Sequence, residues 1–137
     1  MNPLGLEVGQ RARRSKTVTA RDVELYAEIT GDRNPLHFDA DFAGRTRFGR
    51  LVAQGGITAG MLNALVAMDL PGPGTVFMSQ SLRYLAPTYL GDTLTAEVEV
   101  LAVKPDKPVC QLRATITNQD GTLVLEGECW TYTLRPE

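Results

Sequence analysis

The hydrophobic residues of this chain follow two patterns, one suited to a buried helix and one suited to strands. Residues 55–70 are almost entirely apolar, and Thr58 and Asn63 are the main polar exceptions. A helix that is apolar on all sides must be buried on all sides, so we expect a central buried helix here. The sequence 71–74, Pro-Gly-Pro-Gly, ends that helix, because neither helix nor strand tolerates this run.

The second half of the chain alternates between apolar and polar residues. This alternation is clear over residues 93–100 and again over 110–117, and residues 75–86 and 123–134 are rich in β-forming side chains. Alternation with a period of two is typical of strands that bury one face. We therefore predict four antiparallel strands after the helix, and a first strand near Val18.

Two turns determine the register of the last strands. Centring a hairpin on Asp120-Gly121 pairs residues whose numbers sum to 241, so that Arg113 faces Glu128. Cys110 and Cys129 then lie diagonally on the inner, apolar face. The preceding turn, residues 104–107, lies between strands whose apolar positions are all even-numbered. Pairing apolar residues with apolar residues across this turn requires paired residue numbers with an even sum, which predicts an odd-length loop or a β-bulge.

A short helix is predicted to begin after Thr19, with Asp22 completing a capping box and Gly31 ending the helix in a left-handed conformation. Residues 32–54 form a long loop with one helical turn near residues 40–43, and loops of this length usually have a function. Together these elements predict an α+β chain: a long antiparallel sheet wrapped around a buried central helix, which is the hotdog fold.

The composition narrows the class of protein. A chain of 137 residues predicts one domain, residues 1–137. A net charge of -2 and 14 Lys+Arg against 16 Asp+Glu give no reason to bind nucleic acid. No apolar run approaches the roughly 20 residues of a membrane helix, and no signal-peptide core is present, so we expect a cytoplasmic protein that binds no membrane.

The same composition limits the chemistry. With one histidine, the chain cannot build a multi-histidine metal site, and we expect no metal. The two cysteines are interpreted as small core residues. No glycine pattern of the Walker or Rossmann type occurs, which disfavours nucleotide hydrolysis and hydride transfer.

The most informative segment is residues 31–39, Gly-Asp-Arg-Asn-Pro-Leu-His-Phe-Asp. Asp32 and His37 lie five residues apart on a loop stiffened by Pro35. A carboxylate and an imidazole held on one loop can both hydrogen-bond the same water molecule and exchange protons with it. The alternative is simple turn chemistry, in which Asp and Asn side chains bond nearby backbone.

Residues 31–37 resemble the hydratase signature of the MaoC-like dehydratases, in particular the (R)-specific enoyl-CoA hydratases. Further similarity runs through residues 6–10, 71–83, 90–92 and 117–121. The resemblance implies reversible syn addition of water to a trans-2-enoyl-CoA, which gives an (R)-3-hydroxyacyl-CoA. It also implies an acyl-CoA substrate, no separate cofactor, since coenzyme A is part of the substrate, and a homodimer.

Three catalytic roles follow from the resemblance by position. Asp32 would act as general base toward the water, and His37 would share its positioning and assist proton delivery to C2. The backbone amide of Gly55 would stabilise the charge on the thioester oxygen. Elementary electrostatics agrees, because Gly55 begins the buried helix, where free N–H groups favour negative charge.

The candidate substrate-binding residues are Asn34, Gln54, Asn63 and Arg83. Gln54 departs from the family, in which many members have histidine there. Asn63 is interpreted either as a core amide with a partner or as a polar wall that shortens the acyl pocket. Candidates for the coenzyme A phosphates, judged by charge alone, are Arg83, Lys104 and Lys107, and the alternative for each is an ordinary solvated surface charge.

Two other functions fit the same fold. A hotdog acyl-CoA thioesterase would hydrolyse the thioester, but such enzymes usually place their carboxylate elsewhere. A non-catalytic acyl-CoA-binding or partner subunit would have lost the Asp/His pair, whereas this chain keeps both Asp32 and His37.

Overall fold

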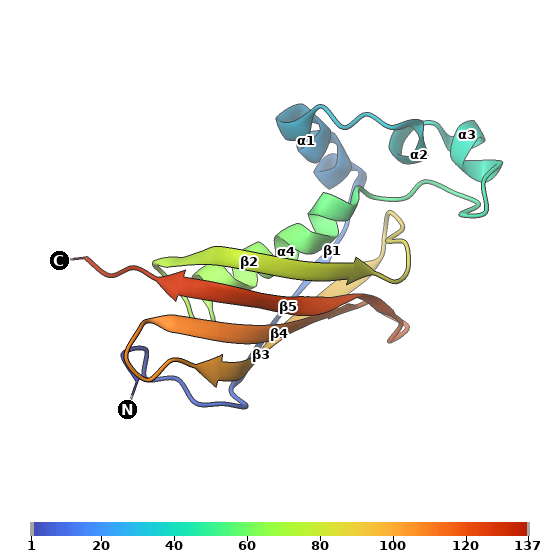
Figure 1. Ribbon diagram of the computed structural model, residues 1–137. Helices are drawn as coiled ribbons and strands as arrows, with labels where there is room; N and C mark the ends of the chain where they lie inside the picture. The colour runs from blue at the N-terminus through green and yellow to red at the C-terminus, as the bar shows by residue number, and fades with distance from the viewer. Residues whose placement is uncertain (1, 137) are drawn as a thin grey trace.

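A computed structural model describes residues 2–136 and shows one antiparallel sheet with a long helix across it (Figure 1). The strand order is β1-β3-β4-β5-β2, so β1 and β2 form the two edges. Helix α4 packs against β1, β2 and β3. The strands are β1 (Arg11–Thr17), β2 (Thr75–Tyr84), β3 (Thr93–Val103), β4 (Val109–Thr117) and β5 (Leu123–Thr133). The α+β arrangement predicted from the sequence is confirmed.

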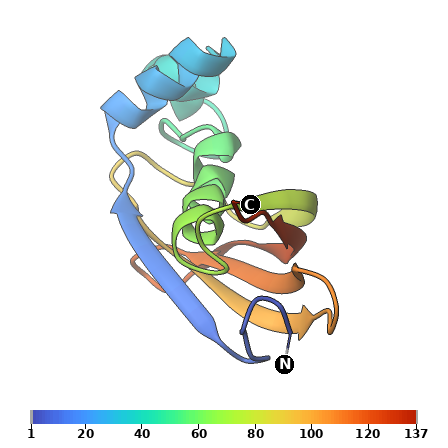
Figure 2. The same cartoon turned by 90° about the vertical axis from the view of Figure 1, so that its left-hand side faces the viewer.

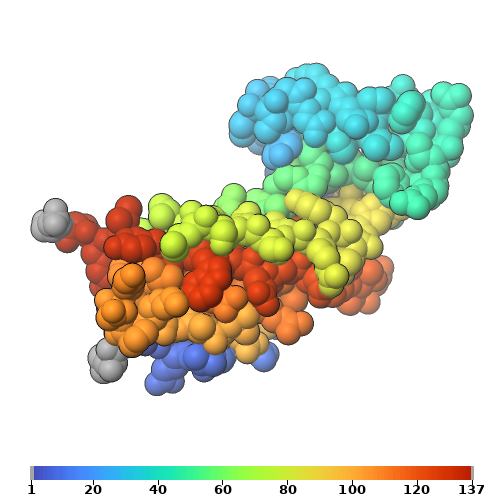
Figure 3. Space-filling model, in the orientation of Figure 1, coloured from blue at the N-terminus to red at the C-terminus, as the bar shows by residue number. Residues whose placement is uncertain are grey.

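The helices form two groups. The long helix α4 (Gly55–Met68) follows the concave side of the sheet, as the turned view in Figure 2 shows. Three shorter helices, α1 (Ala20–Thr30), α2 (Pro35–Phe38) and α3 (Ala40–Gly44), stand away from the sheet beside the start of α4. We call residues 18–54 the arm, and the space-filling view in Figure 3 shows it projecting beyond the sheet.

The core lies between the sheet and α4. The four apolar residues of β3 that alternate along the strand are fully buried, and so are Leu112 and Ile116 of β4. Leu62 and Leu65 of α4 pack against them. Burial of a valine, leucine or isoleucine side chain contributes about 1.5–3 kcal/mol, which is why the alternating pattern determines the face that turns inward. The buried residues of β3 are Leu94, Ala96, Val98 and Val100.

Both register predictions are confirmed. Arg113 pairs with Glu128, and the sum of 241 holds along most of the β4–β5 pair. The β3–β4 pair has an even sum up to Val100, and a β-bulge follows between Val100 and Ala102. The bulge lets both strands keep their apolar residues on the inner face.

The prediction that α4 is buried on all sides is wrong for the single chain. Its inner face is buried, but Asn63 is exposed and Met68 is 59% exposed. The reason is geometric: one sheet covers one face of a helix, and the arm lies only beside the start of α4.

The caps of α1 are confirmed. Thr19 accepts a hydrogen bond from the backbone of Asp22, and Asp22 accepts one from the backbone of Thr19. Gly31 ends the helix with φ 82°. In the following loop, α3 occupies the position expected for a helical turn, whereas α2 was not predicted.

Candidate active site

The turn between α1 and α2 positions the Asp/His segment. Gly31 ends α1 in a left-handed conformation, and Pro35 occupies the first turn of α2, where its missing N–H costs nothing. The Asn34 side chain caps α2 by accepting a hydrogen bond from Leu36 at 3.0 Å. Asp32 Oδ1 accepts from the backbone of Asn34 at 3.3 Å. The turn chemistry considered as an alternative is therefore present, and it shapes the loop that carries the pair.

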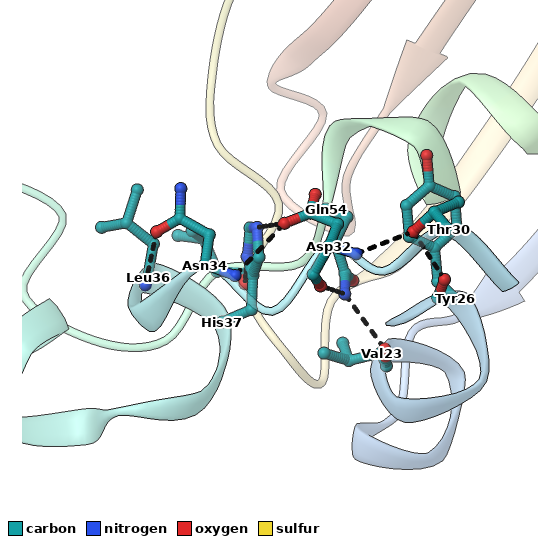
Figure 4. Close-up of polar contacts among 9 residues, drawn as sticks. Val23, Tyr26, Thr30, Asp32, Asn34, Leu36, His37 and Gln54 are labelled. Carbon is teal, nitrogen blue, oxygen red and sulfur yellow. Dashed lines mark hydrogen bonds and ion pairs between the residues drawn. The ribbon is translucent and has the colours of Figure 1, made fainter. Parts of the chain in front are cut away.

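Asp32 and His37 face each other across this loop (Figure 4), with His37 Nε2 3.7 Å from Asp32 Oδ1. His37 is 8% exposed, and its Nδ1 lies 2.7 Å from the carbonyl oxygen of Val52. A carbonyl can only accept, so Nδ1 carries a proton and Nε2 of the neutral ring is left as an acceptor. At 3.7 Å the two groups do not bond each other directly, which leaves both free to bond a third oxygen.

Gln54 lies behind this pair and holds the loop that carries it. Its side chain is buried, and its amide nitrogen donates to the carbonyl of Val23 at 3.0 Å and to the carbonyl of Asp32 at 3.4 Å. Both amide hydrogens are therefore used. Its carbonyl oxygen, Oε1, is buried without a hydrogen-bond partner in the described structure. Gln54 thus contacts the backbone of the loop and does not line the cavity described below.

Gly55 begins α4, with its N–H at the positive end of the helix. No acceptor within residues 2–136 is assigned to this N–H. The ring of Tyr84 packs against Gly55, and a Cβ there would lie 3.1 Å from Cε2 of that ring. At Gly56 a Cβ would lie 1.7 Å from the hydroxyl oxygen of Tyr26. The two glycines therefore let aromatic side chains pack closely at the start of the helix.

A cavity of about 310 Å³ lies between the arm, the start of α4 and the ends of β2 and β5. Its wall is mainly apolar, and its polar groups include His37, Gly55 and the hydrogen-bonded pair Thr58 and Thr88. Within residues 2–136, Arg47 is the one Lys, Arg, Asp or Glu residue on that wall. The remaining lining residues are Leu36, Phe48, Val52, Ala53, Tyr84, Leu85, Ala86, Pro87 and Val124.

Sequence reasoning missed several of these residues, Arg47, Phe48 and Tyr84 among them. Arg47 and Phe48 lie in the long loop whose length indicates a function, but no periodic pattern in the sequence identifies these two residues. Tyr84 follows the strand pattern of β2, which says nothing about the distant helix that its ring contacts.

None of the four expected substrate-binding residues lines the cavity in the single chain: Asn34 and Gln54 contact the Asp/His loop, and Arg83 and Asn63 lie elsewhere. Arg83 points to the outer face of the sheet, where it forms an ion pair with Glu126. Its neighbour Tyr84 faces the cavity instead, because successive side chains of a strand point to opposite faces. Asn63 is exposed on α4, so in the single chain it is neither a core amide nor a wall of this cavity.

The lysines expected to bind phosphate lie far from the cavity. Lys104 and Lys107 belong to the β3–β4 loop, at the end of the sheet opposite the arm (Figure 1). The Lys104 ammonium lies 5.4 Å from the ring centre of Trp130. Both lysines are therefore poor candidates for a ligand that reaches His37 in the same chain.

The remaining titratable groups of interest are the cysteines. Burial raises the pKa of Cys110 to about 11 and that of Cys129 to about 12. Both are free thiols on the inner face, as expected. Among residues 2–136, no three His, Cys, Asp or Glu side chains are grouped so as to hold a metal ion. No helix of the described chain is long and apolar enough to cross a membrane.

The fold and site define a class: an α+β hotdog domain with an Asp/His pair beside the N-terminus of its central helix. The family described as "MaoC like domain" matches residues 5–122. The (R)-specific enoyl-CoA hydratase of Aeromonas caviae is 42% identical over 93% of this chain and 96% of its own length. The 3-hydroxybutyryl-CoA dehydratase of Methylorubrum extorquens is 43% identical over 90% of this chain and 78% of its own.

The structural comparison agrees. The solved (R)-hydratase of A. caviae, described as involved in PHA biosynthesis, superposes with a TM-score of 0.91 at 41% identity, covering 95% of this chain and 98% of that one. The chain belongs to the MaoC-like dehydratase family, and its fold is the hotdog fold. The relatives named above are hydro-lyases.

Proposed function

We propose that the protein catalyses the (R)-specific, reversible hydration of trans-2-enoyl-CoA thioesters. The observation that carries the proposal is the Asp32–His37 pair, 3.7 Å apart, with His37 on the wall of the same cavity as Gly55. The similarity to (R)-specific enoyl-CoA hydratases supports the same substrate class.

The proposed reaction uses the pair as one unit. The Asp32 carboxylate accepts a proton from a water held between it and His37 Nε2, while the water oxygen bonds to C3. The π electrons of the C2–C3 bond move toward the thioester oxygen, and the N–H of Gly55 stabilises the charge that develops there. The electrons then return to form a C2–H bond with a proton delivered from the pair. The site ends as it began, with one water added to the substrate.

Syn addition follows from the position of the pair. Asp32 and His37 lie on one short loop, so the hydroxyl and the proton reach the double bond from the same side. The hydrogen bond from His37 Nδ1 to the Val52 carbonyl fixes the ring so that Nε2 points toward the water.

Asn34 and Gln54 support the reaction without binding the substrate. Asn34 caps α2, which carries His37, and Gln54 holds the carbonyl of Asp32. Where many relatives have histidine, this chain thus uses an amide to fix the loop. Both are positioning residues.

We further propose that residues 1–137 act as one domain and that two copies form a homodimer. Strand β5 lies beyond the matched span 5–122, yet it pairs with both β4 and β2, so the sheet needs it. β2 is an edge strand that exposes Val76 and Met78, and Met68 of α4 is exposed as well. A second copy can pair with this edge about a two-fold axis and cover those side chains.

The direct test follows crotonyl-CoA through the absorbance of its conjugated thioester, with chiral analysis of the product. We expect (R)-3-hydroxybutyryl-CoA from the wild type and a loss of about 10²–10⁴-fold in rate for Asp32→Asn, because the general base is removed. Asp41→Asn is the matched control, since that exposed carboxylate pairs with Arg45 and is absent from the cavity wall.

Other outcomes would favour the other two functions. Release of free thiol from acyl-CoA, without loss of the double bond, would identify a thioesterase. Binding of acyl-CoA without any turnover would identify a non-catalytic subunit. Full activity of both Asp32→Asn and His37→Ala would refute the mechanism.

A further inference from the structure

The loop at the outer end of the arm is rich in arginine. Residues 45–50, Arg-Thr-Arg-Phe-Gly-Arg, carry three arginines in six positions, in a chain whose net charge is -2. Arg45 pairs with Asp41 at 2.9 Å. Arg47 and Arg50 have no carboxylate within ion-pair distance among residues 2–136. The other cations that do have such a partner are Arg11, Arg13, Arg14, Lys16, Arg33 and Arg83.

Arg47 connects this loop to the candidate active site. It lines the cavity that contains His37 and Gly55, and it is exposed, so its charge lies where the cavity opens to solvent. Its guanidinium carbon is 5.8 Å from the ring centre of Phe48, another lining residue. An anion attached to a molecule in the cavity would therefore find this guanidinium free.

Arg50 is held in place by an aromatic ring. Its guanidinium carbon lies 3.9 Å from the ring centre of Tyr89, a cation–π contact. The Tyr89 hydroxyl donates to the backbone carbonyl of Phe48 at 2.9 Å, and the Phe48 N–H donates to the Thr46 hydroxyl at 3.2 Å. These contacts order the loop, so little side-chain freedom remains to be lost when a ligand binds Arg50.

We propose that Arg47 and Arg50 bind the phosphate groups of the coenzyme A part of the substrate. This inference rests on the proposed function, which places the enoyl thioester beside His37. Coenzyme A carries its phosphates at the end of the pantetheine group that is far from the thioester, outside the space that holds the reacting carbons. Guanidinium groups form paired hydrogen bonds with phosphate oxygens, and two that lack carboxylate partners attract a polyanion strongly. The proposal assigns to this loop the role that charge alone suggested for Arg83, Lys104 and Lys107.

The test compares substrates with and without phosphate. Crotonyl-CoA and crotonyl-pantetheine share the reacting carbons, but only the first carries phosphates. For Arg47→Gln/Arg50→Gln we expect kcat/KM for crotonyl-CoA to fall by about 10- to 100-fold, mainly through KM, since charge-assisted hydrogen bonds are lost. For crotonyl-pantetheine we expect values within about twofold of the wild type. The dependence of kcat/KM on ionic strength should also weaken.

The control is Arg113→Gln, which removes one arginine charge from the outer face of the sheet. It should leave the ratio of kcat/KM values for the two substrates unchanged. Crotonyl-phosphopantetheine then locates the contact. A large loss of activity on this substrate assigns the arginines to the phosphate next to the pantetheine, and no loss assigns them to the phosphates of the nucleotide.

The proposal is overturned if the double variant loses activity equally on crotonyl-CoA and crotonyl-pantetheine, or on neither. Calorimetric binding of coenzyme A itself separates this inference from the proposed function. Binding by the wild type that is weakened at least tenfold in the double variant supports the phosphate site even without turnover. Equal binding by both proteins, or none by the wild type, refutes it.

Discussion

Replacing Gln54 by methionine tests whether the buried amide stabilises the fold or serves the loop of Asp32. Gln54 is 1% exposed, and methionine has a similar length and no hydrogen-bonding amide. The substitution removes the 3.0 Å bond to Val23 and the longer 3.4 Å bond to Asp32. A hydrogen bond of ordinary length, such as the one to Val23, contributes about 0.5–1.5 kcal/mol to stability, and the longer bond to Asp32 contributes less.

An opposite effect comes from Oε1, which is buried without a partner. Removing an unsatisfied buried acceptor returns about 1–3 kcal/mol, and a swap of similar volume usually costs under about 1.5 kcal/mol. The effects oppose each other, so we expect Gln54→Met to change the free energy of unfolding by less than about 1 kcal/mol. In the active site the result should differ: kcat should fall while KM changes little, because the carbonyl of Asp32 is no longer held.

The matched control is Gln54→Asn, whose amide is one methylene too short to reach either carbonyl. It leaves polar atoms buried without partners, and we expect a loss of about 2–4 kcal/mol. Urea unfolding of the three proteins measures these differences, and steady-state kinetics measures kcat and KM. A loss above about 2 kcal/mol in Gln54→Met would refute the reasoning, since it would mean that Oε1 is hydrogen-bonded in solution.

Three further predictions concern burial, assembly and the acyl pocket. Burial raises the pKa of Cys110 and Cys129 to about 11 and about 12, so both thiols should resist a thiol reagent at pH 8 until the protein unfolds. Because these pKa values are raised, the stability that the neutral thiols contribute is complete below the ordinary thiol pKa and is lost as pH rises through about 11–12, which alkaline unfolding would detect. Met78→Lys, at the exposed edge β2, should shift the proposed dimer toward monomer in sedimentation, and an active wild-type monomer would contradict the assembly. If a second copy makes Asn63 a pocket wall, Asn63→Ala should raise activity on longer enoyl chains relative to crotonyl-CoA, whereas an unchanged preference would remove that role.

The sequence determined most of the sheet, because strand signals are local and repeat every two residues. Alternation along 93–100 and 110–117 identified the buried faces, and the turn at Asp120-Gly121 gave the pairing of Arg113 with Glu128. The parity argument for the preceding turn predicted the bulge next to Val100. Each conclusion needs only neighbours in sequence and the rule that one face must be buried.

The sequence was less informative about α4 and the arm. A run of apolar residues does not say whether one layer or two will cover it, and in the single chain one face of α4, including Asn63, stays open. The four-residue helix α2 is too short for a periodic pattern, so its existence depends on the cap from Asn34 and on contacts from elsewhere, such as the Val52 N–H donating to the carbonyl of Leu36.

For the candidate site, a short motif in the sequence pointed to the Asp32 and His37 pair, and the family resemblance added the glycine at the helix start. Only the tertiary structure showed that Gln54 holds the loop and that Arg47 lines the cavity. The physical reason is that a side chain's partner is set by where the chain returns in space. Alternation along β2 turns Arg83 outward and Tyr84 inward, and the path of the arm brings Arg47 to the cavity that contains His37.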